Sequence, residues 1–259
     1  MKDLLNQFKT DKMEVKIFSS RDSMGIRAAE EIADQVDDLL NKKNEIRMIF
    51  AAAPSQNEML AELRKHKDID WSRVVAFHMD EYIGIDPDAP QAFGQFLRER
   101  LFDELPFKEI HYIDPQAEDP EKEAARYEEL LKKYPVDICC MGIGENGHIA
   151  FNDPHIADFN APQLVKIVEL DEVSRQQQVN DGCFASLDAV PETAITLTIP
   201  ALTNADHCFI VVPAESKQNA VYNTIKGPVN TDCPATILRK HDNAILYLDR
   251  DSAGKLDLT

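Results

Sequence analysis

The feature that most constrains the fold is the regular alternation of short apolar runs with longer amphipathic segments along nearly the whole chain. Short apolar runs are typical of strands buried on both faces, and segments with apolar residues every three or four positions are typical of helices that cover a sheet. We therefore predict an α/β fold, Rossmann-like, with a mostly parallel open sheet and helices on both faces. The predicted strands cover residues 14–18, 47–52, 73–79, 111–113, 136–141, 165–170, 193–199, 207–212 and 244–248, and the predicted helices cover residues 22–42, 56–67, 91–102 and 120–133, with a short helix at the N-terminus.

The length of 259 residues fits one large α/β domain, and no linker or internal repeat divides it. We expect residues 1–259 to form a single domain. The sequence contains no long apolar segment, signal peptide or low-complexity tract. These features predict a cytoplasmic protein without a membrane partner.

The formal net charge of −18 argues against nucleic acid as a partner, because binding its phosphates needs a basic surface. A small anionic ligand would need local cations and backbone amides that act against the overall field. The five cysteines are odd in number, have no CxxC spacing, and lie mostly in or beside apolar or helical stretches. We expect small buried side chains there, and neither a disulfide framework nor a metal site.

The most informative loop covers residues 142–154 and follows the apolar run 136–141. In open α/β sheets, ligands and catalytic groups collect at the carboxyl ends of the strands. This loop has three glycines, which let the backbone turn tightly, and it carries His148 and Asp153 at a spacing of five. Taken alone it could be an ordinary turn with a polar histidine, but its composition favours a proton-transfer site.

Two further loops follow predicted strands. The strand at 73–79 runs into Asp80 and Glu81, a pair that alone would be typical of a solvated turn or a helix cap. Residues 51–58 close a strand and open a helix, with Ser55 and Glu58 at capping-box spacing. A helix start there would offer free amides to a phosphate, although a well-capped helix without a ligand has the same pattern.

Residues 77–84 and 142–154 resemble the two signature segments of the glucosamine-6-phosphate deaminase family, also called glucosamine-6-phosphate isomerases. Weaker similarity extends from about Ile17 to Leu248. The resemblance implies a small-molecule partner, an amino-sugar phosphate, and an enzyme that converts a 2-amino-2-deoxyhexose 6-phosphate and water to a ketose 6-phosphate and ammonia.

The resemblance also implies roles for individual residues. Asp80 would move the proton at C2, and His148 would open the sugar ring with help from Asn146 and Asp153. Asp153 stands where Glu is usual, and Asn146 where some members carry Asp. Because each step is a proton transfer, the chemistry requires no metal or redox cofactor.

The phosphate site that the resemblance implies differs from the family pattern. Residues 51–55 correspond to a loop that usually resembles TGSTP, but here the glycine is missing. Arg175 and Lys217 occupy the places of the family's phosphate-binding cations, although each alone would be an ordinary surface charge on a helix. The expected substrate- and phosphate-binding residues are Ala53, Ser55, Gln56, Gly144, Gly147, Arg175 and Lys217.

Three functions remain open. Glucosamine 6-phosphate is the favoured substrate of a deaminase, and galactosamine 6-phosphate is the alternative epimer. A 6-phosphogluconolactonase would share the fold, but that family has DER at residues 80–82, and this chain has DEY. A sugar-phosphate-binding regulator without activity would not need both Asp80 and His148.

The chain is a possible homo-oligomer. In the regulated members of the family, an N-acetylated amino-sugar phosphate lies between subunits, held partly by basic residues just after the histidine loop. Here Lys166 is the only Lys or Arg in residues 155–166. We therefore expect no such regulation.

Overall fold

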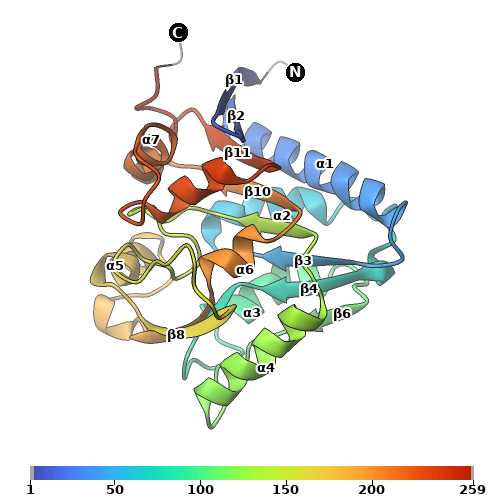
Figure 1. Ribbon diagram of the computed structural model, residues 1–259, viewed down its shortest axis with the longest axis vertical. Coiled ribbons are helices and arrows are strands. Elements are labelled where there is room, and N and C mark those ends of the chain that lie inside the picture. The colour runs from blue at the N-terminus through green and yellow to red at the C-terminus, as the bar shows by residue number, and fades with distance from the viewer. Residues whose placement is uncertain (1–2, 258–259) are drawn as a thin grey trace.

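The computed structural model describes residues 3–257 and contains two sheets. The main sheet has eight strands in the order β1-β2-β11-β10-β7-β3-β4-β6, and all its neighbouring strands are parallel except β1 and β2. A smaller antiparallel sheet has the order β5-β9-β8. The predicted α/β fold with a mostly parallel sheet is confirmed (Figure 1).

The strands are β1 (Leu4–Thr10), β2 (Met13–Phe18), β3 (Ile46–Phe50), β4 (Val74–His78), β5 (Asp80–Tyr82), β6 (Glu109–His111), β7 (Ile138–Met141), β8 (Val165–Glu169), β9 (Thr193–Leu197), β10 (His207–Val212) and β11 (Ala244–Asp249). The α-helices are α1 (Arg21–Leu40), α2 (Asn57–Leu63), α3 (Phe93–Leu97), α4 (Pro120–Lys133), α5 (Glu172–Asn180), α6 (Ile199–Thr203) and α7 (Gln218–Lys226). Shorter helical turns are η1 (Pro54–Gln56), η2 (Trp71–Arg73), η3 (Arg98–Phe102), η4 (Leu187–Ala189), η5 (Glu215–Lys217) and η6 (Pro234–Lys240). No helix within residues 3–257 has the length and apolar character needed to cross a membrane.

The N-terminal helix predicted from the sequence is wrong. Residues Leu4–Thr10 form strand β1, which pairs antiparallel with β2 through a tight turn that contains Asp11 at a φ of 50°. Leu4, Leu5 and Phe8 have a spacing that also suits one helical turn. In the structure, side chains along β1 alternate between half-buried and exposed, so Leu5 remains exposed at the edge of the sheet.

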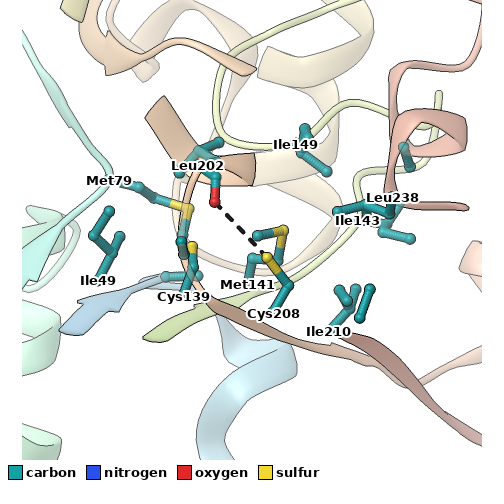
Figure 2. Packing of buried hydrophobic residues seen from close by; sticks show 14 of the residues in the cluster. Ile49, Met79, Cys139, Met141, Ile143, Ile149, Leu202, Cys208, Ile210 and Leu238 are labelled. Atoms are coloured by element: carbon teal, nitrogen blue, oxygen red, sulfur yellow. Dashed lines mark hydrogen bonds between the residues drawn. The ribbon is translucent and has the colours of Figure 1, made fainter. Parts of the chain in front are cut away.

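Alternate residues of the central strands supply two separate hydrophobic clusters, one on each face of the sheet. In β7, Cys139 and Met141 pack on the face covered by α4, α6 and α7, whereas Ile138 and Cys140 pack on the face covered by α1 and α2. Figure 2 shows part of the first cluster, where Cys139 and Cys208 lie in register on adjacent strands. Apolar side chains on both faces explain why these strands are continuous apolar runs in the sequence.

The chain leaves the main sheet directly after β4. Met79 separates β4 from β5, and Asp80 pairs with Thr196 of the smaller sheet. The predicted strand at 73–79 therefore ends where the path of the backbone changes. This change places Asp80 beside the carboxyl ends of β3 and β7, whose outgoing connections lead in opposite directions along the sheet. Such a topological switch point is where open α/β sheets bind ligands.

Candidate active site

A pocket lies at the carboxyl edge of the main sheet, built from the segments that follow five of its strands and from α5. The helix contributes one wall through Gln177 and Gln178, with Asp181 just beyond its end. The strand-end residues of the pocket are Arg21 after β2, residues 51–55 after β3, Met79 and Asp80 after β4, residues 142–144 and His148 after β7, and Pro213, Ala214, Ser216 and Lys217 after β10. The pocket therefore unites all three loops singled out in the sequence.

Asp80 is a buried carboxylate without a hydrogen-bond or ion-pair partner among residues 3–257. Burial raises the pKa of Asp80 well above its usual range, and the charge of neighbouring Glu81 raises it further. A carboxylate with a raised pKa is a better proton acceptor than an ordinary one. Asp80 thus has the environment of a general base rather than that of a structural ion pair.

Glu81 points away from the pocket. Its carboxylate accepts hydrogen bonds from the backbone N–H groups of Tyr82 at 3.0 Å, Phe93 at 3.0 Å and Gly94 at 2.8 Å. Burial raises the pKa of Glu81 to about 7, although these three donors oppose the rise. Adjacent residues of a strand face opposite sides, so the two acids of β5 serve different purposes. Glu81 holds the start of α3 in place.

His148 lies against the backbone of its own loop. A Cβ atom on Gly144 would approach the ring atoms of His148 to within 2.1–2.4 Å, so only glycine allows this position of the imidazole. Gly147 has a φ of +87°, and a Cβ there would come within 2.5 Å of the Cys233 sulfur. The two glycines therefore shape the loop for packing reasons, and Gly144 also lines the pocket.

Behind His148 lies a compact hydrogen-bonded group that contains Asp153, Asn146 and Ser174. The Nδ1 atom of His148 lies 2.8 Å from Asn146 Oδ1, 3.0 Å from Ser174 Oγ and 3.1 Å from Asp153 Oδ1. Asn146 Nδ2 donates to Asp153 Oδ1 at 2.9 Å. The aspartate thus contacts His148 even though it is one methylene shorter than the usual glutamate.

Asp153 is fully buried, yet it remains ionised. Burial alone would raise the pKa of Asp153, but its hydrogen bonds to His148, Asn146 and Ser174 and the charge of His148 hold it below its usual value. The carboxylate is therefore a permanent acceptor that orients the imidazole.

Lys217 is 5% exposed, and its Nζ has no hydrogen-bond or ion-pair partner within the described part of the chain. Burial lowers the pKa of Lys217 from its usual value, against the effect of the nearby Asp181 and Glu145. The preceding Ala214 has a φ of 84° and a ψ of 149°, a strained conformation for any residue with a Cβ. An unpaired buried ammonium is costly, and an anionic ligand would neutralise it.

A model of the family described as glucosamine-6-phosphate isomerases/6-phosphogluconolactonase matches residues 19–247. The chain belongs to this family. It is 40% identical over 194 residues to a glucosamine-6-phosphate deaminase of an Exiguobacterium species, covering 75% of this chain and 74% of the relative. It is 35% identical over 231 residues to a glucosamine-6-phosphate deaminase of Bacillus cereus, covering 88% and 86% of the two chains.

Solved structures agree with this assignment. A monomeric glucosamine-6-phosphate deaminase superposes with a TM-score of 0.84 at 26% identity, over 93% of this chain and 98% of that one. A 6-phosphogluconolactonase from Thermotoga maritima has a TM-score of 0.75 at 20% identity, over 92% and 100% of the two chains, and shows the shared fold alone. The protein is therefore an enzyme of the glucosamine-6-phosphate isomerase family.

Among the predicted family residues, Arg175 lies outside the pocket. Its guanidinium donates to the backbone carbonyls of Leu187 at 2.9 Å and Val190 at 3.0 Å and lies 3.8 Å from Glu192. This placement does not support the predicted phosphate contact. The reason is local: one terminal nitrogen of Arg175 binds both carbonyls, which holds the guanidinium at the η4 turn and the approach to β9.

Gln56 and the predicted capping box also differ from the prediction. Gln56 is completely buried below the loop, and its Nε2 donates to Ser55 Oγ at 2.9 Å and to Val211 O at 3.1 Å. Pro54 begins the η1 turn without a side-chain cap, and Glu58 binds Arg21 instead of closing the box. The lining residues of this loop are Ala51, Ala52, Ala53, Pro54 and Ser55.

Sequence reasoning missed two residues that matter here. Arg21 lines the pocket, its Nε donates to Glu58 at 2.7 Å, and a terminal nitrogen donates to the Pro54 carbonyl. Its position directly after β2 was a usable signal, since the other strand ends were chosen on that ground. Ser174 had no comparable signal, because its contacts depend on how α5 packs against a loop more than twenty residues away.

Proposed function

We propose that the protein is a glucosamine-6-phosphate deaminase, which converts the amino-sugar phosphate and water to a ketose 6-phosphate and ammonia. One observation carries the proposal: a single pocket is lined by an oriented imidazole and by a buried carboxylate and a buried ammonium that have no partner among the described residues. The deaminase names of the relatives agree with this chemistry. Because Asp80 and His148 line the same pocket, catalysis is favoured over a purely regulatory role.

His148 opens the sugar ring. The atoms around its Nδ1 include a carboxylate oxygen and an amide oxygen, which can only accept, so Nδ1 carries a proton. Neutral His148 then has an unprotonated Nε2, which has no partner among residues 3–257. In that form Nε2 takes the proton of the C1 hydroxyl as the ring opens and returns it to the ring oxygen. Asp153 stabilises the imidazolium that forms between these two transfers.

Proton transfer between C2 and C1 falls to Asp80. As a carboxylate it removes the proton from C2 of the open chain and delivers it to C1, while a proton of the C2 amino group passes to the C1 oxygen. The product has a C1 hydroxyl and a C2 imine. Water adds to that imine, and ammonia leaves to give the ketone. No side-chain hydrogen bond or ion pair within residues 3–257 stabilises the ionised form of Asp80, so the carboxylate stays basic, which favours removal of a weakly acidic carbon-bound proton.

Lys217, Arg21 and Ser55 bind the phosphate at its end of the pocket. Arg21 has the phosphate-binding role that was predicted from the sequence for Arg175. Its Nη1 has no partner in the described chain, while its other donors fix the guanidinium beside Pro54. Two local cations meet the requirement set by a net charge of −18.

The test supplies glucosamine 6-phosphate and galactosamine 6-phosphate separately and measures ammonia together with the ketose phosphate. Equal amounts of both products from the gluco epimer support the proposal, and turnover of only the galacto epimer would assign the alternative substrate. A parallel assay with 6-phosphogluconolactone measures acid release. Lactone hydrolysis without ammonia from either amino sugar would overturn the deaminase function.

A further inference from the structure

Ser174 occupies a position that no catalytic assignment includes. Its side chain is 1% exposed, and its hydroxyl oxygen lies 2.5 Å from Asp153 Oδ1 and 3.0 Å from His148 Nδ1. It does not line the pocket, so it would not touch a bound sugar. Any influence on the reaction must act through the histidine and the aspartate.

The direction of these hydrogen bonds follows from their chemistry. An ionised aspartate can only accept, so the Ser174 hydroxyl donates its single proton to Asp153. The serine oxygen then presents a lone pair to Nδ1 of His148. Ser174 thereby does two things at once: it donates to the acceptor that orients His148, and it adds an acceptor on the Nδ1 side of the ring.

Helix α5 contacts the histidine loop through two different side chains. Ser174 and Gln177 are the buried residues of α5, and both contact the loop at 142–153 through polar atoms. Gln177 Oε1 accepts the backbone N–H of Glu145 at 2.9 Å, which fixes the loop before the histidine. Ser174 fixes the ring itself. Gln177 thus anchors the helix to the loop, and Ser174 orients the imidazole. A substitution of either residue tests its effect alone.

We propose that Ser174 is a positioning residue that keeps the proton of His148 on Nδ1 and the unprotonated Nε2 directed toward the substrate. The effect on turnover rests on the proposed deaminase function, whereas the effect on the ring does not. Asp153 Oδ1 receives its contacts from His148, Asn146 and Ser174, and Oδ2 has no partner within residues 3–257. Loss of the Ser174 hydroxyl therefore leaves the carboxylate with two donors.

The kinetic test compares Ser174→Ala with Ser174→Thr. The alanine variant should lower kcat on the order of 10- to 100-fold with little change in KM, the range expected for loss of one hydrogen bond to a charged group. The threonine variant restores the hydroxyl and should recover most of kcat. The matched control is Gln176→Ala, which removes an exposed polar side chain from the same helix and should change neither constant.

Two kinetic results would overturn the inference. An unchanged kcat in Ser174→Ala is one, and a raised KM with full kcat is the other, since that pattern would mean that Ser174 only anchors the pocket wall. If the threonine methyl prevents folding, Ser174→Cys provides a second variant, with a side chain of similar size and a weaker donor. It should fall between wild type and alanine.

A measurement without turnover separates this inference from the proposed function. Nitrogen-15 NMR of the ligand-free enzyme reports the Nδ1–H group of His148, and a His148→Asn sample identifies its signal. In Ser174→Ala this signal should shift or broaden through faster exchange with water, while Gln176→Ala leaves it in place. An unaltered signal in Ser174→Ala would overturn the inference even in an active deaminase. A shifted signal in an enzyme that deaminates no hexosamine phosphate would overturn the function alone.

Discussion

Two charged side chains that line the pocket differ from two charged side chains that lie outside it. Asp80 and Lys217 line the pocket, and their side chains have no hydrogen-bond or ion-pair partner within residues 3–257. Burial raises the pKa of Asp80 and lowers the pKa of Lys217, which favours the neutral form of each. Asp153 and Arg175 do not line the pocket, and each makes at least two hydrogen bonds. Charges left unsatisfied in the free protein are available to a ligand, and satisfied charges give those groups a fixed frame.

The largest expected effect comes from Asp80→Asn. The amide keeps the shape of the side chain but cannot accept a proton, so kcat should fall by a factor on the order of 10³ or more. Substrate affinity should remain within a few-fold of wild type. The direct measurement is exchange of the C2 proton with deuterated water, followed by proton NMR.

The stability of the same variant provides the control. Removing an unpartnered buried carboxylate should leave the unfolding free energy at pH 8 unchanged or higher. Near-normal C2 exchange in Asp80→Asn would show that another group is the base. A large loss of stability would show that Asp80 has structural partners after all.

A Glu81→Gln variant tests whether three backbone hydrogen-bond donors are enough to keep a buried carboxylate ionised. Its folded pKa of about 7 lies above the usual 4.5, so the folded state favours the protonated form. Its stabilising contribution is complete below pH 4.5 and is lost as the pH rises through 7. Between these limits, wild type should lose about 3 kcal/mol of unfolding free energy relative to Glu81→Gln.

Urea unfolding of both proteins from pH 4.5 to pH 8 measures this difference. A gap that changes with pH in the stated direction means that burial outweighs the three backbone donors. Parallel curves would mean that those donors keep Glu81 ionised over this whole pH range.

Lys217→Met and Arg175→Met form a matched pair on the basic side of the comparison. The Lys217 variant should lose about 1.5 to 3 kcal/mol of binding free energy for the phosphorylated sugar and nearly none for the free amino sugar. The Arg175 variant should bind both ligands as before but unfold about 1 to 2 kcal/mol more easily, because the carbonyls of Leu187 and Val190 each lose one donor. Calorimetric titration and urea unfolding measure both quantities.

A phosphate-specific loss in the Arg175 variant would restore the assignment made from the sequence. It would mean that the guanidinium leaves the carbonyls of Leu187 and Val190 when substrate binds. Equal losses for both sugars in the Lys217 variant would show that Lys217 supports the pocket wall rather than the phosphate.

The sequence predicted the layers well because strands buried on both faces carry a strong apolar signal. Helix α4 begins and ends at the predicted residues, 120 and 133. The prediction of an N-terminal helix was wrong, because the spacing of Leu4, Leu5 and Phe8 fits a helix as well as the edge strand β1. At the site, Asp80 and His148 were found because they lie in segments that directly follow predicted strands.

The remaining site residues depend on tertiary contacts that local patterns do not contain. The phosphate contact of Arg175 was predicted from its sequence neighbours, but one of its terminal nitrogens binds the carbonyls of Leu187 and Val190. Ser174 was missed because an internal helix position has no distinguishing signal. A capping pattern at Ser55 and Glu58 was overridden because Glu58 has Arg21 as a stronger partner.

The smallest expected effect is that of an N-acetylated amino-sugar phosphate on the rate curve. Within residues 155–166 the only Lys or Arg is Lys166, and its Nζ donates to the Ile156 carbonyl at 3.0 Å. Burial lowers the pKa of Lys166, and Asp158 lies near it, so this segment neutralises a second phosphate poorly. An effector that binds both states equally cannot shift the balance between them. Initial rates should follow a hyperbola in substrate, with no activation by N-acetylglucosamine 6-phosphate. A sigmoidal curve that becomes hyperbolic with that compound would mean that cations from another segment or subunit build an effector site.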